Sequence, residues 1–153
     1  MNGLGAPYWN SKVKGIIFGI TPKVTQTEIV RSALESIAFR VRDLVEAIKD
    51  EAGVFPLSIS VDGKPTSNNF LMQFQSDILG LPIVRYSNHE ITSAGVAYMA
   101  GKSSGFIDPA ELKEKRTPER VFQPGMARKT ADRYYDGWKQ AVNAAIYSYK
   151  RLK

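Results

Sequence analysis

The stretch from Asp62 to Asn69, Asp-Gly-Lys-Pro-Thr-Ser-Asn-Asn, holds the residue types best suited to contacting a ligand. Gly63 would let a ligand approach the backbone closely. Ser67, Asn68 or Asn69 can cap a following helix, whose free N–H groups suit a phosphate or another acceptor. The simpler interpretation is a tight Asp-Gly turn and a helix cap without any ligand. The spacing alone leaves both interpretations open.

The other reactive side chains form no catalytic pattern. His89 is the only histidine and cysteine is absent, so the sequence predicts no histidine-dependent metal centre, no thiolate site and no disulfide. Asp77 lies near the end of a predicted helix, where a carboxylate opposes the helix dipole, and either a specific partner or plain solvent exposure would account for it. Four carboxylates of an earlier helix fit a solvated polar face better than an acid–base pair: Glu35, Asp43, Glu46 and Asp50.

The candidate turn joins elements of a predicted α/β fold. Residues 57–61 alternate apolar and polar side chains as a strand does, residues 70–79 carry an apolar helical face, and residues 81–85 form a second strand. The two strands of such a unit are expected to be parallel, with a right-handed crossover. The turn therefore lies at the carboxyl end of the first strand, where open α/β sheets bind ligands.

A long amphipathic helix is predicted before this unit. Apolar residues recur at helical spacing between Thr25 and Gly53. Thr25 and Glu28 have the spacing of a capping box, and Gly53 suits the carboxyl end of the helix. The preceding residues 1–24 are rich in glycine and proline and predict an irregular entry segment containing a short strand or turn.

After the unit, the sequence predicts two further helices. Residues 92–101 are rich in alanine and glycine, and we expect this helix to lie flat against the sheet. Residues 102–126 contain three prolines among charged residues and predict a surface excursion. A final amphipathic helix spans residues 134–149. Its aromatic residues, like Tyr8 and Trp9, are expected to pack in a core or between domains.

The composition predicts one domain over residues 1–153 and excludes several classes of protein. With 43% hydrophobic and 24% charged residues, the chain is suited to a compact core and is not typical of a disordered protein. No run approaches the roughly 20 apolar residues of a membrane span. No secretory signal follows Met1, and together with the absence of cysteine this fits a cytoplasmic location.

The net charge of +6 favours anionic partners in general. However, the basic residues alternate with acidic ones, as Arg40 and Arg42 do with Asp43, and form no continuous stripe for a phosphate backbone. Nucleic-acid binding is therefore the least favoured function, and we expect no mobility shift with nucleic acid at moderate salt.

Several strings of the sequence resemble the glycerol kinases of the FGGY carbohydrate-kinase family. They are Gly3-Leu-Gly-Ala-Pro-Tyr-Trp9, Ala33-Leu-Glu-Ser-Ile-Ala38, Asn68-Asn-Phe-Leu-Met-Gln-Phe-Gln-Ser-Asp-Ile-Leu-Gly80, Thr92-Ser-Ala-Gly-Val-Ala-Tyr-Met-Ala-Gly101 and Phe122-Gln-Pro-Gly125. The resemblance covers essentially the whole chain. The string over residues 68–80 separates glycerol kinases from other sugar kinases.

This resemblance implies an α/β domain with the ribonuclease-H-like fold of the actin and hexokinase superfamily, containing a mixed sheet with a parallel βαβ unit flanked by helices. It would be the carboxy-terminal nucleotide-binding domain of a two-domain kinase, lacking its first strands and the whole amino-terminal domain. The implied reaction transfers a phosphoryl group from ATP to glycerol, with Mg²⁺ bridging phosphate oxygens, and yields ADP and glycerol 3-phosphate. The exposed sheet edge of such a fragment would favour a homodimer.

The resemblance assigns nucleotide contacts to Gly63, Lys64 and Asn68. Glycerol kinases carry two glycines, a short spacer and two asparagines here; Gly63 and Asn68 match, whereas Lys64 replaces the second glycine. Pro65 should hold Lys64 in an extended conformation and removes one backbone donor. Lys64 would then weaken ATP binding, unless its ammonium group reaches a phosphate.

No catalytic residue is assigned, because the catalytic aspartate and the glycerol contacts of these kinases precede the equivalent of Met1. We expect this chain alone to be inactive. Two other functions stay open: a non-catalytic, kinase-like interaction or regulatory domain, and a kinase of another polyol or sugar.

Overall fold

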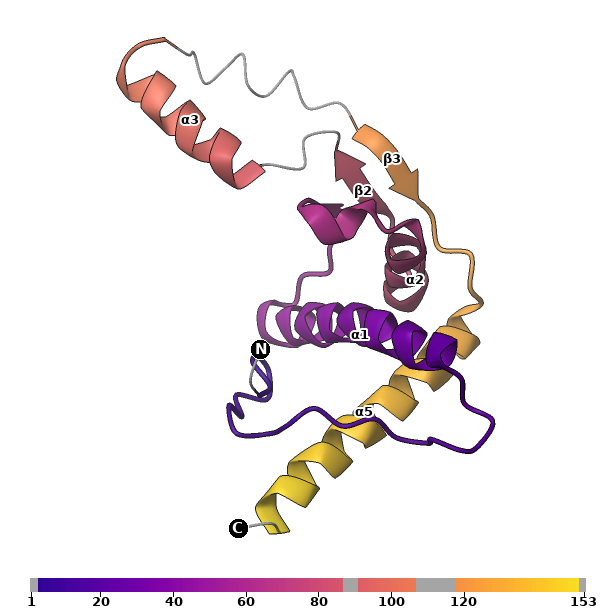
Figure 1. Ribbon diagram of the computed structural model, residues 1–153. Coiled ribbons are helices and arrows are strands. Elements are labelled where there is room, and N and C mark those ends of the chain that lie inside the picture. The colour runs from indigo at the N-terminus through magenta and orange to yellow at the C-terminus, as the bar shows by residue number, and fades with distance from the viewer. Residues whose placement is uncertain (1–2, 87–90, 107–117, 152–153) are drawn as a thin grey trace.

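The computed structural model describes residues 3–86, 91–106 and 118–151 (Figure 1). Along the chain, the elements are α1 (Gln26–Ala52), β1 (Ile59–Val61), a 3₁₀ helix (Lys64–Ser67), α2 (Asn69–Leu79), β2 (Ile83–Tyr86), α3 (Ile91–Ser103), β3 (Pro118–Phe122) and α5 (Arg128–Arg151). None of the helices within these ranges is long and apolar enough to span a bilayer.

The three strands form a mixed sheet in the order β1-β2-β3. β1 and β2 are parallel, with Ile59 opposite Ile83 and Val61 opposite Arg85, which confirms the predicted strand–helix–strand unit. β3 runs antiparallel to β2. This strand corrects the prediction of a surface excursion over residues 102–126. Only Phe122 of β3 is buried, so the segment lacks the alternation by which a strand is recognised.

α1 begins and ends as the sequence predicts. The Glu28 carboxylate accepts a hydrogen bond from the Thr25 backbone N–H at 2.9 Å, and Thr25 Oγ1 contacts the same carboxylate. Gly53 follows the helix in the left-handed conformation, with φ 64°, and donates its N–H to the Lys49 carbonyl. The capping box and the glycine stop are thus confirmed.

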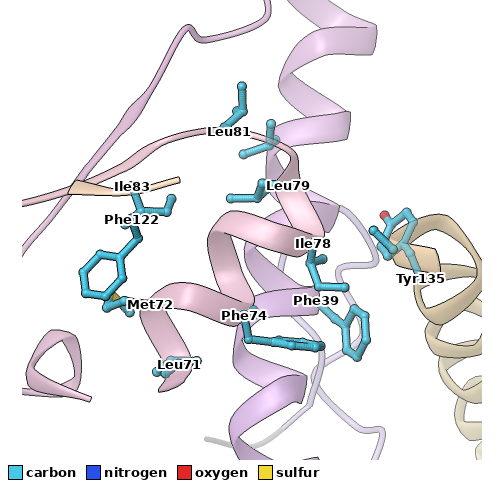
Figure 2. Packing of buried hydrophobic residues seen from close by; sticks show 13 residues of the cluster. Phe39, Leu71, Met72, Phe74, Ile78, Leu79, Leu81, Ile83, Phe122 and Tyr135 are labelled. Atoms are coloured by element: carbon cyan, nitrogen blue, oxygen red, sulfur yellow. The ribbon is translucent and has the colours of Figure 1, made fainter. Parts of the chain in front are cut away.

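α2 lies at the centre of the packing, between the sheet and the two long helices (Figure 2). Ile83 and Phe122 of the sheet pack on one side of it, while Phe39 of α1 and Tyr135 of α5 lie on the other. The Phe39 ring meets the Phe74 ring edge-on, with 5.5 Å between centroids. Because α2 is held on both sides, the turn that precedes it has a fixed place at the end of β1.

α3 departs from its predicted position. Figure 1 shows it standing away from the sheet, rather than lying flat against it. Val96 is 67% exposed and Met99 is 75% exposed, and Tyr98 is exposed as well. These apolar residues are spread around the helix instead of forming one stripe, so their spacing did not specify which face would be covered.

The entry segment before α1 is irregular, as predicted. Leu4 and Asn10 exchange two backbone hydrogen bonds, of 2.7 and 2.8 Å, and close a short loop. Residues 15–19 form no strand, and their apolar side chains are about half exposed. Trp9 is 80% exposed, so its expected packing is not found within the described part of the chain.

Candidate functional site

Gly63 and Asn68 lie at the two ends of the short 3₁₀ helix that follows β1. The Gly63 carbonyl accepts the Thr66 N–H at 3.0 Å and the Thr66 hydroxyl at 2.7 Å. The Asn68 N–H donates to the Pro65 carbonyl at 3.2 Å. The structure therefore brings these two predicted site residues together in one turn at the carboxyl end of a strand.

Gly63 has a backbone conformation that favours glycine, with φ 86° and ψ 165°. A Cβ atom built at this position would lie 3.9 Å from Pro65 Cδ, which is an ordinary contact. The requirement for glycine thus comes from the backbone angles and not from crowding. The open space beside Gly63 also means that a ligand can come close to the main chain.

Asn68 caps α2, since its Oδ1 accepts the Leu71 N–H at 3.1 Å. This confirms the cap predicted for Ser67, Asn68 or Asn69 and selects Asn68 among them. The cap occupies the side-chain oxygen only. A ligand contact from Asn68, which is partly exposed, stays a prediction.

Lys64 is the first residue of the 3₁₀ helix, and it is exposed. The expectation that Pro65 keeps Lys64 extended is therefore wrong. The reason is that the turn is closed around it: the Lys64 carbonyl accepts the Ser67 hydroxyl at 2.8 Å, and Gly63 and Pro65 accept the backbone bonds described above. The Lys64 side chain stands on the surface of the candidate turn.

Arg85 of β2 is a component of the site that sequence reasoning missed. Its guanidinium donates from Nη1 to the Thr66 carbonyl at 2.8 Å and to Asn69 Oδ1 at 3.0 Å, and from Nη2 to Glu119 Oε1 at 2.8 Å. The residue is only 6% exposed. A signal was present, because strand alternation places Arg85 on the same face as buried Ile83, where a charge is unusual.

Asp77 has specific partners, which was one of the two interpretations that its position in the sequence allowed. Its Oδ1 accepts the backbone N–H of Gly125 at 2.7 Å and that of Met126 at 3.2 Å. Gln73 Nε2 donates to the same oxygen at 3.0 Å. Asp77 therefore fastens the segment between β3 and α5 to the end of α2, which is a structural role.

The solvated-face interpretation is wrong for Asp43, which is 3% exposed. Oδ1 accepts the Tyr135 hydroxyl at 2.8 Å, and Oδ2 accepts Trp138 Nε1 and Arg40 Nη1, both at 3.0 Å. The polar side of α1 faces α5 at this point, which helical periodicity alone does not reveal. Burial, reinforced by the Asp43 charge, raises the pKa of Tyr8 to about 12 and also raises the pKa of Tyr135.

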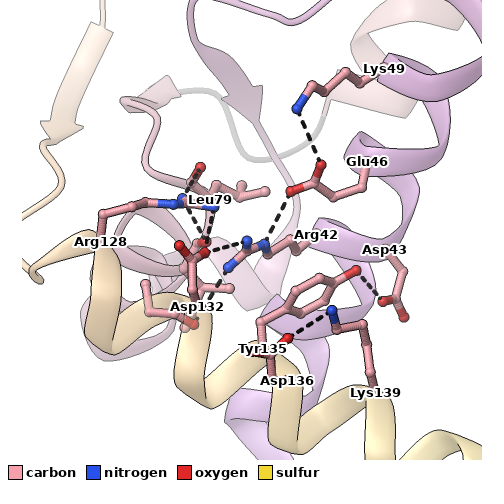
Figure 3. A network of polar contacts seen from close by, with 12 residues as sticks. Arg42, Asp43, Glu46, Lys49, Leu79, Arg128, Asp132, Tyr135, Asp136 and Lys139 are labelled. Carbon is pink, nitrogen blue, oxygen red and sulfur yellow. Dashed lines mark hydrogen bonds and ion pairs between the residues drawn. The ribbon is translucent and has the colours of Figure 1, made fainter.

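Arg42 extends this contact between α1 and α5 (Figure 3). It is 5% exposed, lies over the Tyr135 ring with Cζ 4.0 Å from the ring centroid, and pairs with Asp132 at 2.7 Å. Arg128 pairs with the same carboxylate at 2.9 Å. The hydrogen bond from Arg42 lowers the pKa of Asp132. With every charge paired, this cluster joins two helices and offers no free acid or base.

A cavity of about 430 Å³ opens beside the first turn of α2. Its lining comes from α1 and Phe70, and Arg31 lies over the Phe70 ring with Cζ 5.5 Å from the centroid.

His89 lies outside the described residues. Across the ranges that the structure describes, no three His, Asp or Glu side chains gather as metal ligands would.

Comparison with known proteins now places the chain in a family. Residues 1–104 match the model of the FGGY family of carbohydrate kinases, C-terminal domain. The chain belongs to the FGGY carbohydrate kinases. The family inferred from the sequence strings is thus confirmed.

The curated relatives include glycerol kinases from Klebsiella pneumoniae and Alkaliphilus oremlandii, which are 47% and 45% identical to the chain over 145 residues. Each match covers 94% of this chain and 29% of the relative. The chain thus spans less than a third of the length of these proteins.

Solved structures agree on the fold. The crystal structure of Plasmodium falciparum glycerol kinase with ADP matches 94% of this chain and 29% of its own, with a TM-score of 0.80 and 32% identity. Gluconate kinase from Lactobacillus acidophilus, at 24% identity, matches 97% of this chain and 30% of its own with a TM-score of 0.74, and supports the fold alone. The predicted α/β fold of the actin and hexokinase type, with its mixed sheet, is confirmed.

Proposed function

We propose that this chain is the carboxy-terminal, nucleotide-binding domain of an ATP-dependent glycerol kinase, which converts glycerol and ATP to glycerol 3-phosphate and ADP. The observation that supports it best is the turn from Gly63 to Asn68 at the carboxyl end of β1, in a chain 47% identical to a glycerol kinase over 145 residues. That position is where open α/β sheets bind their ligands.

In this proposal, Gly63 lets the nucleotide approach the main chain, and Asn68 and the start of α2 provide hydrogen-bond donors. Phosphoryl transfer relies on positioning and on neutralising the phosphate charge, for which kinases use Mg²⁺. Because Mg²⁺ in kinases is held largely by the substrate phosphates and by one or two carboxylates, those carboxylates would come from the remaining part of the longer kinase. Glycerol contacts and the proton acceptor would come from the remaining part of the longer kinase.

The substrate is tested with the full-length gene product, assayed with ATP and glycerol, xylulose or gluconate in parallel. We expect turnover with glycerol at a far lower KM than with either sugar substrate. Turnover of another polyol or sugar without turnover of glycerol would remove the substrate assignment while keeping the kinase.

The site is tested by two substitutions at one residue. Asn68→Ser keeps a side-chain oxygen for the α2 cap but removes the amide donor, whereas Asn68→Ala removes both. We expect Asn68→Ser to raise the KM for ATP about tenfold with little change in the KM for glycerol or in thermal stability. Asn68→Ala should also destabilise the fold by about 1 kcal/mol. An unchanged KM for ATP in both variants would remove Asn68 from the site.

A second candidate function is a kinase-like domain that no longer uses ATP. It is favoured by exposed Lys64, which stands where glycerol kinases carry a glycine that allows close approach of the nucleotide. Lys64→Gly distinguishes the two functions. Nucleotide binding that appears only in the glycine variant would support lost ATP use, whereas tight binding before and after the substitution would show that the lysine is tolerated.

A further inference from the structure

Arg85 occupies a position where the sheet would ordinarily carry an apolar side chain. It alternates with Val84 on β2 and shares the buried face of Ile83, which is 0% exposed. Burying a guanidinium costs free energy unless its donors find partners, and an apolar residue of similar size often stabilises a core at least as well. An arginine at this place therefore points to a role other than filling the core.

The contacts of Arg85 converge on the candidate turn. Arg85 lies opposite Val61, the last residue of β1, so its side chain starts beside the point where the turn leaves the sheet. A single atom, Nη1, donates to the Thr66 carbonyl at 2.8 Å and to Asn69 Oδ1 at 3.0 Å. These two acceptors stand on either side of Asn68 in the chain. One side chain thus holds both the end of the 3₁₀ helix and the start of α2.

The other side of the guanidinium is anchored to β3. Nη2 pairs with Glu119 Oε1 at 2.8 Å, and Cζ lies 5.4 Å from the centroid of the Phe122 ring. The Nε–H is buried without a hydrogen-bond partner among the described residues. The contacts of Nη1 and Nη2 therefore hold the guanidinium in place, although the Nε–H has no partner there.

We propose that Arg85 is a positioning residue, which holds the main chain from Gly63 to Asn68 in the conformation that the adenine nucleotide contacts. This inference rests on the proposed function. Arg85 touches no reacting atom in this role. It links the affinity of the turn for nucleotide to the antiparallel strand β3, which has no other part in the site.

The test uses the full-length gene product and compares Arg85→Met with Arg85→Lys. Arg120→Met is the matched control, because Arg120 lies on β3, is exposed, and contacts the same Phe122 ring, with Cζ 4.6 Å from its centroid. Two quantities are measured: backbone hydrogen exchange over residues 64–72, with residues 131–142 of α5 as the internal reference, and the dissociation constant for ADP.

For Arg85→Met we expect exchange over residues 64–72 to accelerate about tenfold or more while α5 is unchanged, since two hydrogen bonds to a charged group are lost. ADP affinity should fall about tenfold. Arg85→Lys should restore part of both, and Arg120→Met should change neither. Equal acceleration in both regions, no acceleration, or accelerated exchange with unchanged ADP affinity would each overturn the proposal.

Asn69→Ala provides a second variant in case Arg85→Met does not fold. It removes one acceptor of the guanidinium from an exposed side chain and should give a smaller, equally local acceleration. Failure of the wild-type protein to bind ADP would overturn the proposed function instead. The exchange measurement would then still decide whether Arg85 fixes the turn.

Discussion

The Asp43 carboxylate of α1 accepts the hydroxyl group of Tyr135, 92 residues later on α5, at 2.8 Å. Trp138 Nε1 and Arg40 Nη1 donate to its other oxygen. Asp43→Asn keeps the size of the side chain but removes the charge and turns an amide donor toward these donors. We expect it to lower the free energy of unfolding by about 2–4 kcal/mol.

Urea unfolding followed by tryptophan fluorescence measures this loss. Asp50→Asn, an exposed carboxylate on the same helix, serves as the control and should change stability by less than about 0.5 kcal/mol. A loss in Asp43→Asn no larger than that of the control would show that the buried hydrogen bonds contribute nothing to stability.

Because of two tyrosines close to Asp43, Tyr8 and Tyr135, we expect the fold to lose stability at alkaline pH. An unfolded tyrosine ionises near pH 10, whereas the pKa of Tyr8 in the folded chain is raised to about 12 and that of Tyr135 is also raised, mainly through burial. The stabilisation is therefore complete below pH 10 and is lost as pH rises toward 12, because the unfolded state releases its protons first.

Urea midpoints measured between pH 9 and pH 12 test this dependence. Tyr135→Phe removes one of the two groups and should show a shallower decline than the wild-type protein, though it begins from a lower stability. Parallel declines in the two proteins would contradict a role for Tyr135 in the alkaline transition.

Much of the fold was predictable because local rules determine it. The capping box of Thr25 and Glu28, the Asn68 cap and the glycine that ends α1 lie within a few residues of the groups that they satisfy. The parallel pairing of β1 and β2 follows from the helix between them. β3 was missed because an edge strand with one buried residue has no alternating pattern. The position of α3 was missed because its apolar residues are spread around the helix and form no single face.

The candidate site likewise contains residues that local rules could predict and residues that they could not. The turn that carries Gly63 and Asn68 could be located, since both residues fit requirements set by the adjacent backbone. Arg85 and Asp43 could not be assigned, because all their partners except Arg40 lie 16 to 95 residues away along the chain. For Arg85, the useful signal is a charged residue that shares a strand face with buried Ile83. Asp43 gave no such signal, because it lies on the polar side of α1.

We expect Asp77, near the carboxyl end of α2, to contribute to the stability of the fold. Asp77→Ala frees the backbone N–H groups of Gly125 and Met126, which both donate to its carboxylate. We expect a loss of about 1–3 kcal/mol, together with faster hydrogen exchange around residues 125–130. Asp136→Ala, an exposed carboxylate of α5, is the control. Equal stability of the two variants would mean that solvent replaces the Asp77 carboxylate without cost.

We expect Gly63→Ala to lower the stability of the fold through backbone conformation alone. At φ 86° and ψ 165° an alanine is strained by about 1–3 kcal/mol, although its Cβ would meet only an ordinary contact with Pro65. Gly15→Ala is the matched control, since Gly15 is not among the glycines with positive φ and a Cβ there has open space around it in the described structure. We expect Gly63→Ala alone to lower the thermal midpoint and to weaken ADP binding, because the turn must relax away from the conformation that holds Asn68. If the two alanine variants behave alike in both measurements, the conformation of Gly63 is not required for the turn.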